Sequence, residues 1–254
     1  MSTRTGTKKP LALEVCVESV ASALAAERGG AARVELCSDL LEGGLTPSAG
    51  QIEVVRQNLS VGLHVMIRPH GGDFLYSPEE FEIMQRDIQV AKNLGADGVV
   101  FGMLEPGGTV DLKNTRRLVD FSRPLSVTFH RAFDMSADLF RALEDIVTCG
   151  ADRVLTSGAQ ATAVLGQKVI AELIRVAHGR VIVVPAGGIA GSEVRHLVEA
   201  TGAREIHVGL GNLVPSPMQY RNERVSIGSA RGREYQRFVV LEDSVRDLVA
   251  ACNG

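Results

Sequence analysis

The sequence predicts a single (β/α)8 barrel, the TIM-barrel fold, over residues 1–254. Three observations support this: strand-like and helix-like segments alternate along the chain, eight such pairs are present, and 254 residues is a usual length for one such barrel. Strict alternation indicates parallel strands joined by crossover helices. No GxGxxG motif follows the first strand, which argues against an open sheet that binds a dinucleotide.

Four of the eight strands are marked by a repeated Gly-Ala pair. A glycine just after a helix adopts a left-handed conformation at little cost, so each repeat indicates the end of a helix and the start of a strand. The repeats lie at residues 30–34, 95–99, 150–154 and 202–206, and four further β-like runs alternate with them at residues 11–17, 63–69, 125–130 and 181–185.

Helical patterns fill the intervals between the strands. The third has the clearest start, since Ser77 is a predicted N-cap, Pro78 takes the first helical position and Glu80 completes a capping box. The predicted helices are residues 19–28, 48–58, 78–94, 112–121, 137–149, 162–177, 192–200 and 243–251.

One segment interrupts this alternation, at about residues 210–240 between the last strand and the last helix. It contains several arginines, prolines and glycines and is longer than an ordinary connection. We consider two interpretations, a solvated surface excursion and a lid or oligomer contact. An oligomer contact there would make the protein a homo-oligomer.

Five of the strands are polar on one face only. Side chains alternate along a strand, and helices cover the outside of a barrel, so the aliphatic faces should meet the helices and the polar faces should line the interior. Buried ionisable groups are costly unless they pair, bind a metal or contact a ligand. The interior therefore holds either a functional site or a closed structural network. The expected inward residues are Glu14, Cys16, Arg33, Glu35, Cys37, His64, Met66, Arg68, Ser126, Thr128, His130, Glu205, His207 and Gly209.

The end of the fifth strand offers groups for acid–base chemistry. His130 could transfer a proton near neutral pH, and Arg131 and Asp134 add a cation and a base. Together with inward glutamates, they predict proton transfer on a small polar or anionic molecule at the C-terminal mouth of the barrel. The candidate catalytic residues are Glu14, Glu35, Arg68, His130, Arg131, Asp134 and His207.

Glycine-containing loops at the same end are candidates for binding an anion or cofactor. Gly187 and Gly188 follow the seventh strand, and Ser157 and Gly158 follow the sixth. Barrels often hold phosphate near the loops after strands 7 and 8, and glycine lets backbone N–H groups approach an anion. The alternative is that the Gly pair only forms a tight turn.

Cys16 and Cys37 are candidates for a metal site. They end adjacent strands with the same parity, and neighbouring strands lie about 4.8 Å apart, so the two sulfurs can approach one another. Two thiolates suit Cu(I) or Zn(II) better than Mg(II). The alternative is that each is a small buried apolar residue. Cys149 and Cys252 are interpreted as structural.

Charge and composition exclude several classes of protein. The net charge of -3 gives no basic field for a polynucleotide, so no nucleic-acid partner is expected. Residues 1–10 are polar and Glu14 interrupts the apolar stretch that follows, so we expect no signal peptide and no membrane span. The four cysteines show no CxxC spacing, which indicates reduced thiols and a cytoplasmic protein.

The chain resembles the CutC family of copper homeostasis proteins. The matching stretches are residues 14–17, 34–38, 43–48, 65–69, 71–74, 127–134 and 220–222, with sequences such as Glu-Val-Cys-Val and His-Arg-Ala-Phe-Asp. The resemblance implies a TIM barrel, a cytoplasmic location and a Cu(I) site at Cys16 and Cys37. It also suggests an enzyme-like barrel with an unidentified substrate. Three positions depart from the expected pattern, namely His70, Ala186 and Gly209, and the first two weaken the transfer of an anion site.

Overall fold

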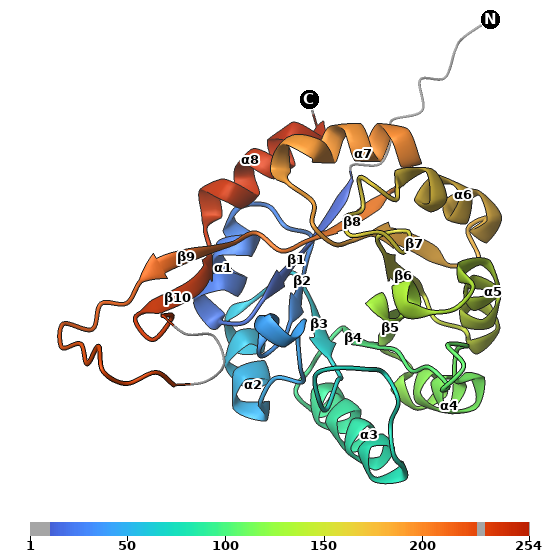
Figure 1. Cartoon of the computed structure of the whole chain (residues 1–254), viewed down its shortest axis with the longest axis horizontal. Coiled ribbons are helices and arrows are strands. Elements are labelled where there is room, and N and C mark those ends of the chain that lie inside the picture. The colour runs from blue at the N-terminus through green and yellow to red at the C-terminus, as the bar shows by residue number, and fades with distance from the viewer. Residues whose placement is uncertain (1–10, 228–231, 254) are drawn as a thin grey trace, which may run out of the picture.

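Eight parallel strands form the predicted barrel. The structure is a computed structural model that describes residues 11–227 and 232–253. The strands are hydrogen-bonded in the order β7-β6-β5-β4-β3-β2-β1-β8, and β8 returns to lie beside β7 (Figure 1). Each strand therefore neighbours those next to it in the chain, and the helices surround the barrel. The TIM-barrel prediction is confirmed.

The elements lie close to their predicted positions. The barrel strands are β1 (Ala12–Val17), β2 (Arg33–Leu36), β3 (Gly62–Met66), β4 (Gly98–Phe101), β5 (Ser126–Phe129), β6 (Arg153–Thr156), β7 (Ile182–Pro185) and β8 (Glu205–Val208). The helices are α1 (Val20–Arg28), α2 (Ala49–Asn58), α3 (Pro78–Asn93), α4 (Leu112–Ser122), α5 (Leu139–Cys149), α6 (Gln167–Ala177), α7 (Val194–Thr201) and α8 (Glu242–Asn253). Short 3-10 turns are η1 (Leu40–Glu42), η2 (Arg131–Met135) and η3 (Gly191–Glu193).

Helix starts follow their capping residues. The capping box of Ser77 and Glu80 is present at the start of α3. The predicted start of the sixth helix at residue 162 is wrong, because α6 begins at Gln167. Residues 163–166 form a turn in which a side chain at position 166 would clash with the Ser157 carbonyl oxygen, and the helix begins directly after this turn.

The barrel has a helix-facing core and a separate interior. The aliphatic strand faces and the helices form one large core, which includes Val15 and Leu63. Inside the barrel lie two small apolar clusters, one of Cys16, Cys37, Met66 and Val100 and one of Leu155, Val184 and Ala186. The polar residues buried in the interior are Glu14, Arg33, Glu35, His64, Arg68, Thr128 and His130.

The segment between β8 and α8 contains a hairpin that projects from the barrel beside α1 (Figure 1). Its strands, β9 (Gly211–Pro215) and β10 (Gln236–Val240), pair antiparallel, whereas no strand was predicted here from the sequence. At its base the Val240 amide donates a 3.1 Å hydrogen bond to Ser22 Oγ on α1. We call residues 211–227 and 232–240 the arm; residues 228–231 lie outside the described part.

Candidate metal and acid–base site

Cys16 and Cys37 meet inside the barrel, as the strand parity predicts. The β1–β2 register pairs Val17 with Leu36, and the Cys37 amide donates a 2.9 Å hydrogen bond to the Val17 carbonyl. The two Sγ atoms lie 3.6 Å apart and both residues are buried. The Cys37 thiol also lies 3.5 Å from Glu35 Oε2. Two sulfurs and a carboxylate oxygen thus lie within 4.8 Å of one another, which is close enough to share one metal ion.

The two thiols differ in how readily they ionise. The hydrogen bond with Cys37 lowers the pKa of Cys16 to about 5, with further help from His207, although burial acts in the opposite direction. The same contact, together with burial, raises the pKa of Cys37 well above its usual value. The two shifts have opposite directions and favour one thiolate, at Cys16, beside one thiol, at Cys37. A thiolate is the form that binds metals.

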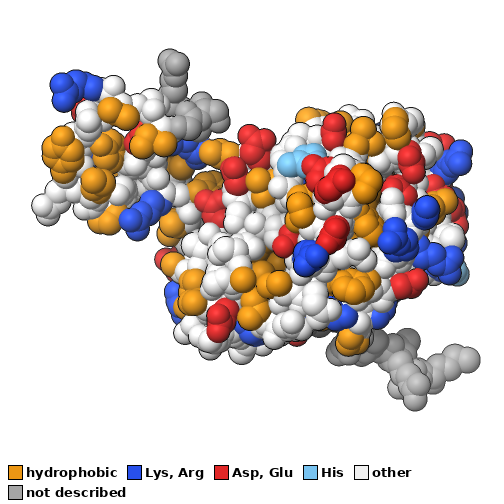
Figure 2. Space-filling view, turned by 90° about the horizontal axis from the view of Figure 1, so that it is seen from below, with side chains coloured by type: hydrophobic (Ala, Val, Ile, Leu, Met, Phe, Trp, Pro, Cys, Tyr) orange, Lys and Arg blue, Asp and Glu red, His pale blue; other side chains and the backbone are white. Residues whose placement is uncertain are grey.

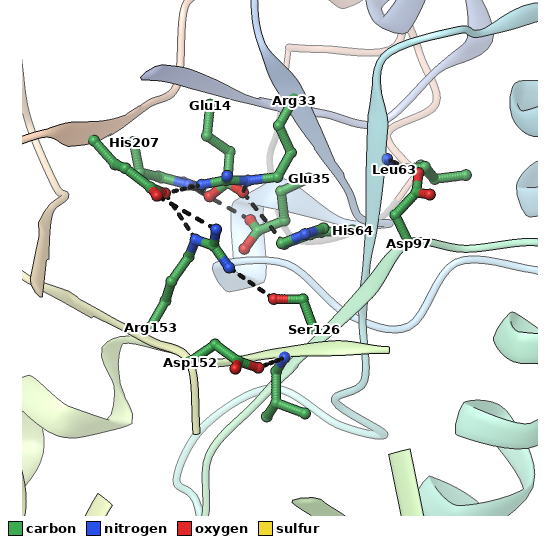
Figure 3. A network of polar contacts seen from close by, with 12 residues as sticks. Glu14, Arg33, Glu35, Leu63, His64, Asp97, Ser126, Asp152, Arg153 and His207 are labelled. Carbon is green, nitrogen blue, oxygen red and sulfur yellow. Dashed lines mark hydrogen bonds and ion pairs between the residues drawn. The ribbon is translucent and has the colours of Figure 1, made fainter. Parts of the chain in front are cut away.

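Glu14 is the buried anion at the centre of the neighbouring network (Figure 3). It accepts hydrogen bonds from Arg33 Nε and, at 2.7 Å, from His207 Nδ1. Burial by itself would raise the pKa of this carboxyl, but the His207 hydrogen bond and the Arg33 charge outweigh it and hold the pKa well below its usual range. Glu14 is therefore ionised.

His207 lies between two glutamates. Its Nδ1 contacts Glu14, and its Nε2 lies 3.8 Å from Glu35 Oε2. Burial alone would lower the pKa of His207, but Glu35, Cys16 and Glu14 together raise it well above its usual value. Burial raises the pKa of Glu35, so the two carboxyls shift in opposite directions around one cation. This arrangement separates a permanent anion, Glu14, from a carboxyl group able to hold a proton, Glu35.

Ion pairs continue this network toward the N-terminal end of the strands (Figure 3). Glu205 Oε2 accepts from Arg33 Nη2 at 2.8 Å and from Arg153 Nε at 2.7 Å. Arg153 Nη1 donates to Ser126 Oγ at 2.7 Å. His64 lies beside Glu14, with Nδ1 at 3.5 Å from Oε2, and burial lowers the pKa of His64 to about 4. The charges at this end are thus paired.

Arg153 was not predicted to face the interior, because β6 shows no polar–apolar alternation. The Gly-Ala repeat contained a usable signal, since its fourth position is inward in each copy. That position is Arg33 in β2, Gly98 in β4, Arg153 in β6 and Glu205 in β8. The absence of a side chain at Gly98 makes room for His64, whose ring a Cβ there would meet at 2.5 Å.

Arg68 holds two loops at the mouth. Its guanidinium donates to the carbonyls of Glu42 at 2.6 Å, Gly44 at 3.2 Å and Gly72 at 3.0 Å. It also lies over the Phe74 ring, 5.0 Å from the centroid. Among the guanidinium nitrogens of Arg68, Nε is buried without a hydrogen-bond partner. Three of its five N–H groups are therefore engaged with the protein, and Nε–H is among those left for the anchoring role predicted from the sequence.

His130 also packs against the Phe74 ring. The ring centroids are 4.9 Å apart, and His130 Nδ1 accepts from the Ala132 amide at 3.2 Å. Burial, together with the Arg68 charge, lowers the pKa of His130 to about 3. The ring is therefore neutral at neutral pH, which favours hydrogen bonding over the proton transfer expected from the sequence. His130 Nε2 has no hydrogen-bond partner and remains available to a ligand.

The remaining predicted residues form a second group at the mouth. Asp134 accepts from Thr156 Oγ1 at 2.6 Å and from the amides of Ser157 and Ala159 at 3.0 and 3.1 Å. Arg131 donates to Asp134 at 2.8 Å and to Ser157 Oγ at 2.8 Å. Asp134 thus orders the loop after β6 and has few lone pairs left for catalysis.

The glycines predicted to bind an anion lie in this second group. Gly187 packs against the Arg131 guanidinium, where a Cβ would lie 2.8 Å from Cζ, and Gly188 packs against Thr162. Gly158, Gly187 and Gly188 all have positive φ, which favours glycine. Among the described residues, no hydrogen bond or ion pair joins this group to the cysteine pair. The structure therefore separates the predicted site residues into two groups.

The fold and these groups define a class: a TIM-barrel protein with a thiol pair and an acid–base network inside its C-terminal mouth. Comparison with known proteins is consistent with this class. The family model described as "CutC family" matches residues 11–212. The chain therefore belongs to the CutC family, as its sequence motifs indicated.

Curated relatives match nearly the whole chain. The copper homeostasis protein cutC homolog of Mus musculus is 48% identical over 250 residues, which cover 98% of this chain and 92% of the mouse protein. A CutC family protein of Bacteroides fragilis is 47% identical over 238 residues, covering 93% of this chain and 95% of that protein. Among described residues, no helix is long and apolar enough to cross a membrane.

A solved structure shares the barrel. The crystal structure of CutC from Streptococcus agalactiae superposes with a TM-score of 0.74 at 30% identity, covering 78% of this chain and 97% of that chain. The family model ends at residue 212, inside β9, so nearly all of the arm lies beyond the matched family core. The match to the mouse protein nevertheless covers 98% of this chain.

Proposed function

We propose that this protein binds Cu(I) through Cys16 and Cys37 and acts in copper homeostasis. The observation that carries the proposal is the 3.6 Å separation of the two buried sulfurs. Thiolate and thioether ligands select Cu(I) over harder ions, and the Met66 side chain packs in the same buried cluster. The relatives named copper homeostasis proteins support the same assignment.

The donor set fits a soft monovalent ion. The two sulfurs would hold the ion, and Glu35 would lie beside them without being required for a two-sulfur site. The low pKa of Cys16 supplies one thiolate, and binding at Cys37 would displace its proton. The protein would act in the cytoplasm, where both thiols stay reduced.

Anaerobic Cu(I) titration against a chromogenic chelator tests this proposal. We expect the wild type to withdraw one copper equivalent and Cys16→Ala/Cys37→Ala to lose most of that affinity. Cys252→Ala is the matched control, because it removes a thiol outside the barrel interior. Equal affinities of the wild type and the double variant would end the proposal.

A second candidate is an enzyme that acts on a small anionic or sugar-like molecule. The observation that favours it is the pair of carboxyls around His207, with the pKa of Glu14 lowered and that of Glu35 raised. Environments that shift the pKa values of two neighbouring carboxyl groups in opposite directions are typical of acid–base sites. Arg68 Nε and His130 Nε2, both unpartnered, would then bind the substrate.

Crystals soaked with phosphate, sulfate, sugar phosphates and divalent metals test the enzyme candidate. It predicts ligand density at the mouth, in contact with Arg68 or His130 or with Arg131 and the Gly187 loop. Density containing only water, with no heat of binding in solution, would contradict it. Copper binding without any such ligand would favour the first candidate.

A further inference from the structure

Four side chains that can bind a metal lie together inside the barrel, on the adjacent strands β8, β1 and β2 or directly after them. Cys37 Sγ is 3.6 Å from Cys16 Sγ and 3.5 Å from Glu35 Oε2. His207 Nε2 is 3.8 Å from the same Glu35 oxygen, and His207 also lies within hydrogen-bonding reach of the Cys16 thiol. Two sulfurs, one oxygen and one nitrogen thus form a closed ring of neighbours.

The spacing of these atoms is close to that of the ligands around a zinc ion. Zn(II) in proteins is bound by four tetrahedral ligands, at about 2.3 Å for sulfur and about 2.0–2.2 Å for nitrogen or oxygen. Ligand atoms at these bond lengths lie about 3.3–3.8 Å from one another. The separations in the barrel are 3.5, 3.6 and 3.8 Å. One ion could therefore contact all four groups.

Glu14 holds His207 in the orientation that a metal ligand needs. Its carboxylate accepts from His207 Nδ1 at 2.7 Å, and Nε2 is the nitrogen that lies near Glu35 (Figure 3). A histidine that binds a metal through one ring nitrogen almost always donates from the other, often to a carboxylate, which fixes its tautomer and orientation. Arg33 in turn donates to Glu14. Glu14 is thus placed to position a ligand without being one.

Glu35 gives independent evidence for a cation. Acidic side chains on the surface are scattered among basic ones, where water hydrates them (Figure 2). Glu35 is different, because it is only 2% exposed and its Oε1 is buried without a hydrogen-bond partner. Burial of a polar oxygen is costly unless the atom meets a donor or a cation. The unpaired oxygen therefore points to an occupant that carries positive charge.

We propose that this set forms a four-coordinate Zn(II) site and that Glu14 positions one of its ligands. Two thiolates and a carboxylate are anions, and a divalent ion neutralises more of this buried charge than a monovalent ion does. Binding would displace the thiol protons to solvent. Four protein ligands leave no open position on the ion, which is typical of a structural zinc site. The ligands are Cys16, Cys37, Glu35 and His207.

The zinc site rests on the thiol pair of the proposed function, because zinc and Cu(I) would use the same two sulfurs. The two ions therefore exclude one another. Cu(I) is selected by the soft sulfur ligands alone, whereas zinc also accepts nitrogen and oxygen ligands. Glu35 and His207 are thus the residues that would favour zinc over Cu(I) in this interior.

Zinc titration of the reduced, metal-free full chain against a chromogenic chelator tests the site. We expect one equivalent to bind, and Glu35→Gln and His207→Gln each to weaken zinc binding about tenfold or more. Both should weaken Cu(I) binding far less, while Cys16→Ala/Cys37→Ala should lose both ions. His196→Gln is the matched control, because it removes an exposed histidine on α7.

Glu14→Gln tests the positioning role. The amide oxygen can still accept from His207, but the carboxylate charge that orients the ring is lost. Zinc affinity should therefore fall about tenfold, with a much smaller change in Cu(I) affinity. A merely structural role would lower both affinities together. Circular dichroism confirms that each variant is folded.

X-ray absorption at the zinc edge uses the wild type alone, so it does not depend on the folding of any variant. We expect two sulfurs and two lighter atoms around the ion. Failure to bind zinc, a shell of sulfur only or without sulfur, or zinc affinity unchanged in Glu35→Gln and His207→Gln overturns the zinc site. Wild type that binds zinc in this way but no Cu(I) supports the zinc site and contradicts the proposed function instead.

Discussion

The two ends of the barrel interior differ in how far their polar atoms are satisfied. Toward the N-terminal end, Glu14, Arg33, Arg153 and Glu205 form one network in which each charged group has a partner, although the buried Nδ1 of His64 beside Glu14 has no hydrogen-bond partner. Toward the mouth, Glu35 Oε1, Arg68 Nε, Thr128 Oγ1 and His130 Nε2 are buried without hydrogen-bond partners. Buried polar atoms in native proteins are nearly all paired with protein or ordered water, so we expect these atoms to meet a water molecule or a ligand. We therefore expect the first region to stabilise the barrel and the second to be where binding occurs.

The largest effect is expected when a charge is removed from the paired network at the N-terminal end. Glu14→Gln removes the buried carboxylate charge that pairs with Arg33 and His207. Loss of one partner of a buried ion pair typically costs about 3–5 kcal/mol, because the other charge stays buried. We expect a decrease of this size in the free energy of unfolding, measured by denaturant titration. Glu172→Gln, which removes an exposed pair with Arg175, should change little. Equal effects of the two substitutions would show that the interior network is not structural.

Acid should destabilise the mouth region through His130. Its pKa is about 3 in the fold against 6.5 as the ordinary value, so between these pH values the unfolded chain binds a proton that the folded chain does not. Stability from this residue is therefore present above about pH 6.5 and is lost as the pH falls. Linkage gives a loss of about 2 kcal/mol between pH 7 and pH 5.

His130→Asn is the comparison for this pH effect. Asparagine keeps an acceptor near the Ala132 amide and cannot take up a proton. Denaturant titrations at pH 7 and pH 5 should show a smaller acid-dependent loss in the variant than in the wild type. The same loss in both proteins would mean that His130 is not held neutral by burial.

The smallest expected effect is a gain in stability, on removal of the Thr128 hydroxyl. Thr128 is fully buried and its hydroxyl has no hydrogen-bond partner, so the folded protein bears the cost of desolvating it. Thr128→Val keeps the shape and removes that cost. We expect a gain of about 1 kcal/mol in the free energy of unfolding. A loss of stability would indicate that the hydroxyl is satisfied, for example by a bound water, and would weaken the contrast between the two regions.

Strand parity predicted much of the interior, and its failures have a physical cause. Glu14, Cys16, Glu35 and Cys37 were placed correctly because aliphatic and polar residues alternate in β1 and β2. In β4, β6 and β7 the inward residues include Val100, Leu155 and Val184, which are as apolar as the outward ones. Alternation therefore cannot show which way those strands face, and Arg153 was missed for this reason.

Loop contacts could not be predicted in the same way. The guanidinium of Arg68 donates hydrogen bonds to the backbone carbonyls of Glu42, Gly44 and Gly72. Backbone carbonyls are present at every residue, so the pattern of side chains in the sequence cannot predict such partners. Asp134 is likewise engaged largely by the loop after β6. The hairpin of the arm was missed because β9 is a five-residue strand that ends in Pro215 and shows no clear alternation. Which side chains of a strand face the interior can be predicted from the local sequence. The loop contacts form only when the barrel is closed.

X-ray absorption at the copper edge tests the central claim most directly, because it reports which atoms surround the ion. Wild-type protein loaded anaerobically with one equivalent of Cu(I) should show sulfur as the dominant ligand, and that signal should be lost in Cys16→Ala/Cys37→Ala and retained in Cys252→Ala. A first shell of nitrogen and oxygen only, or a sulfur signal that survives in the double variant, would contradict the assignment of the mouth as a thiol-based copper site.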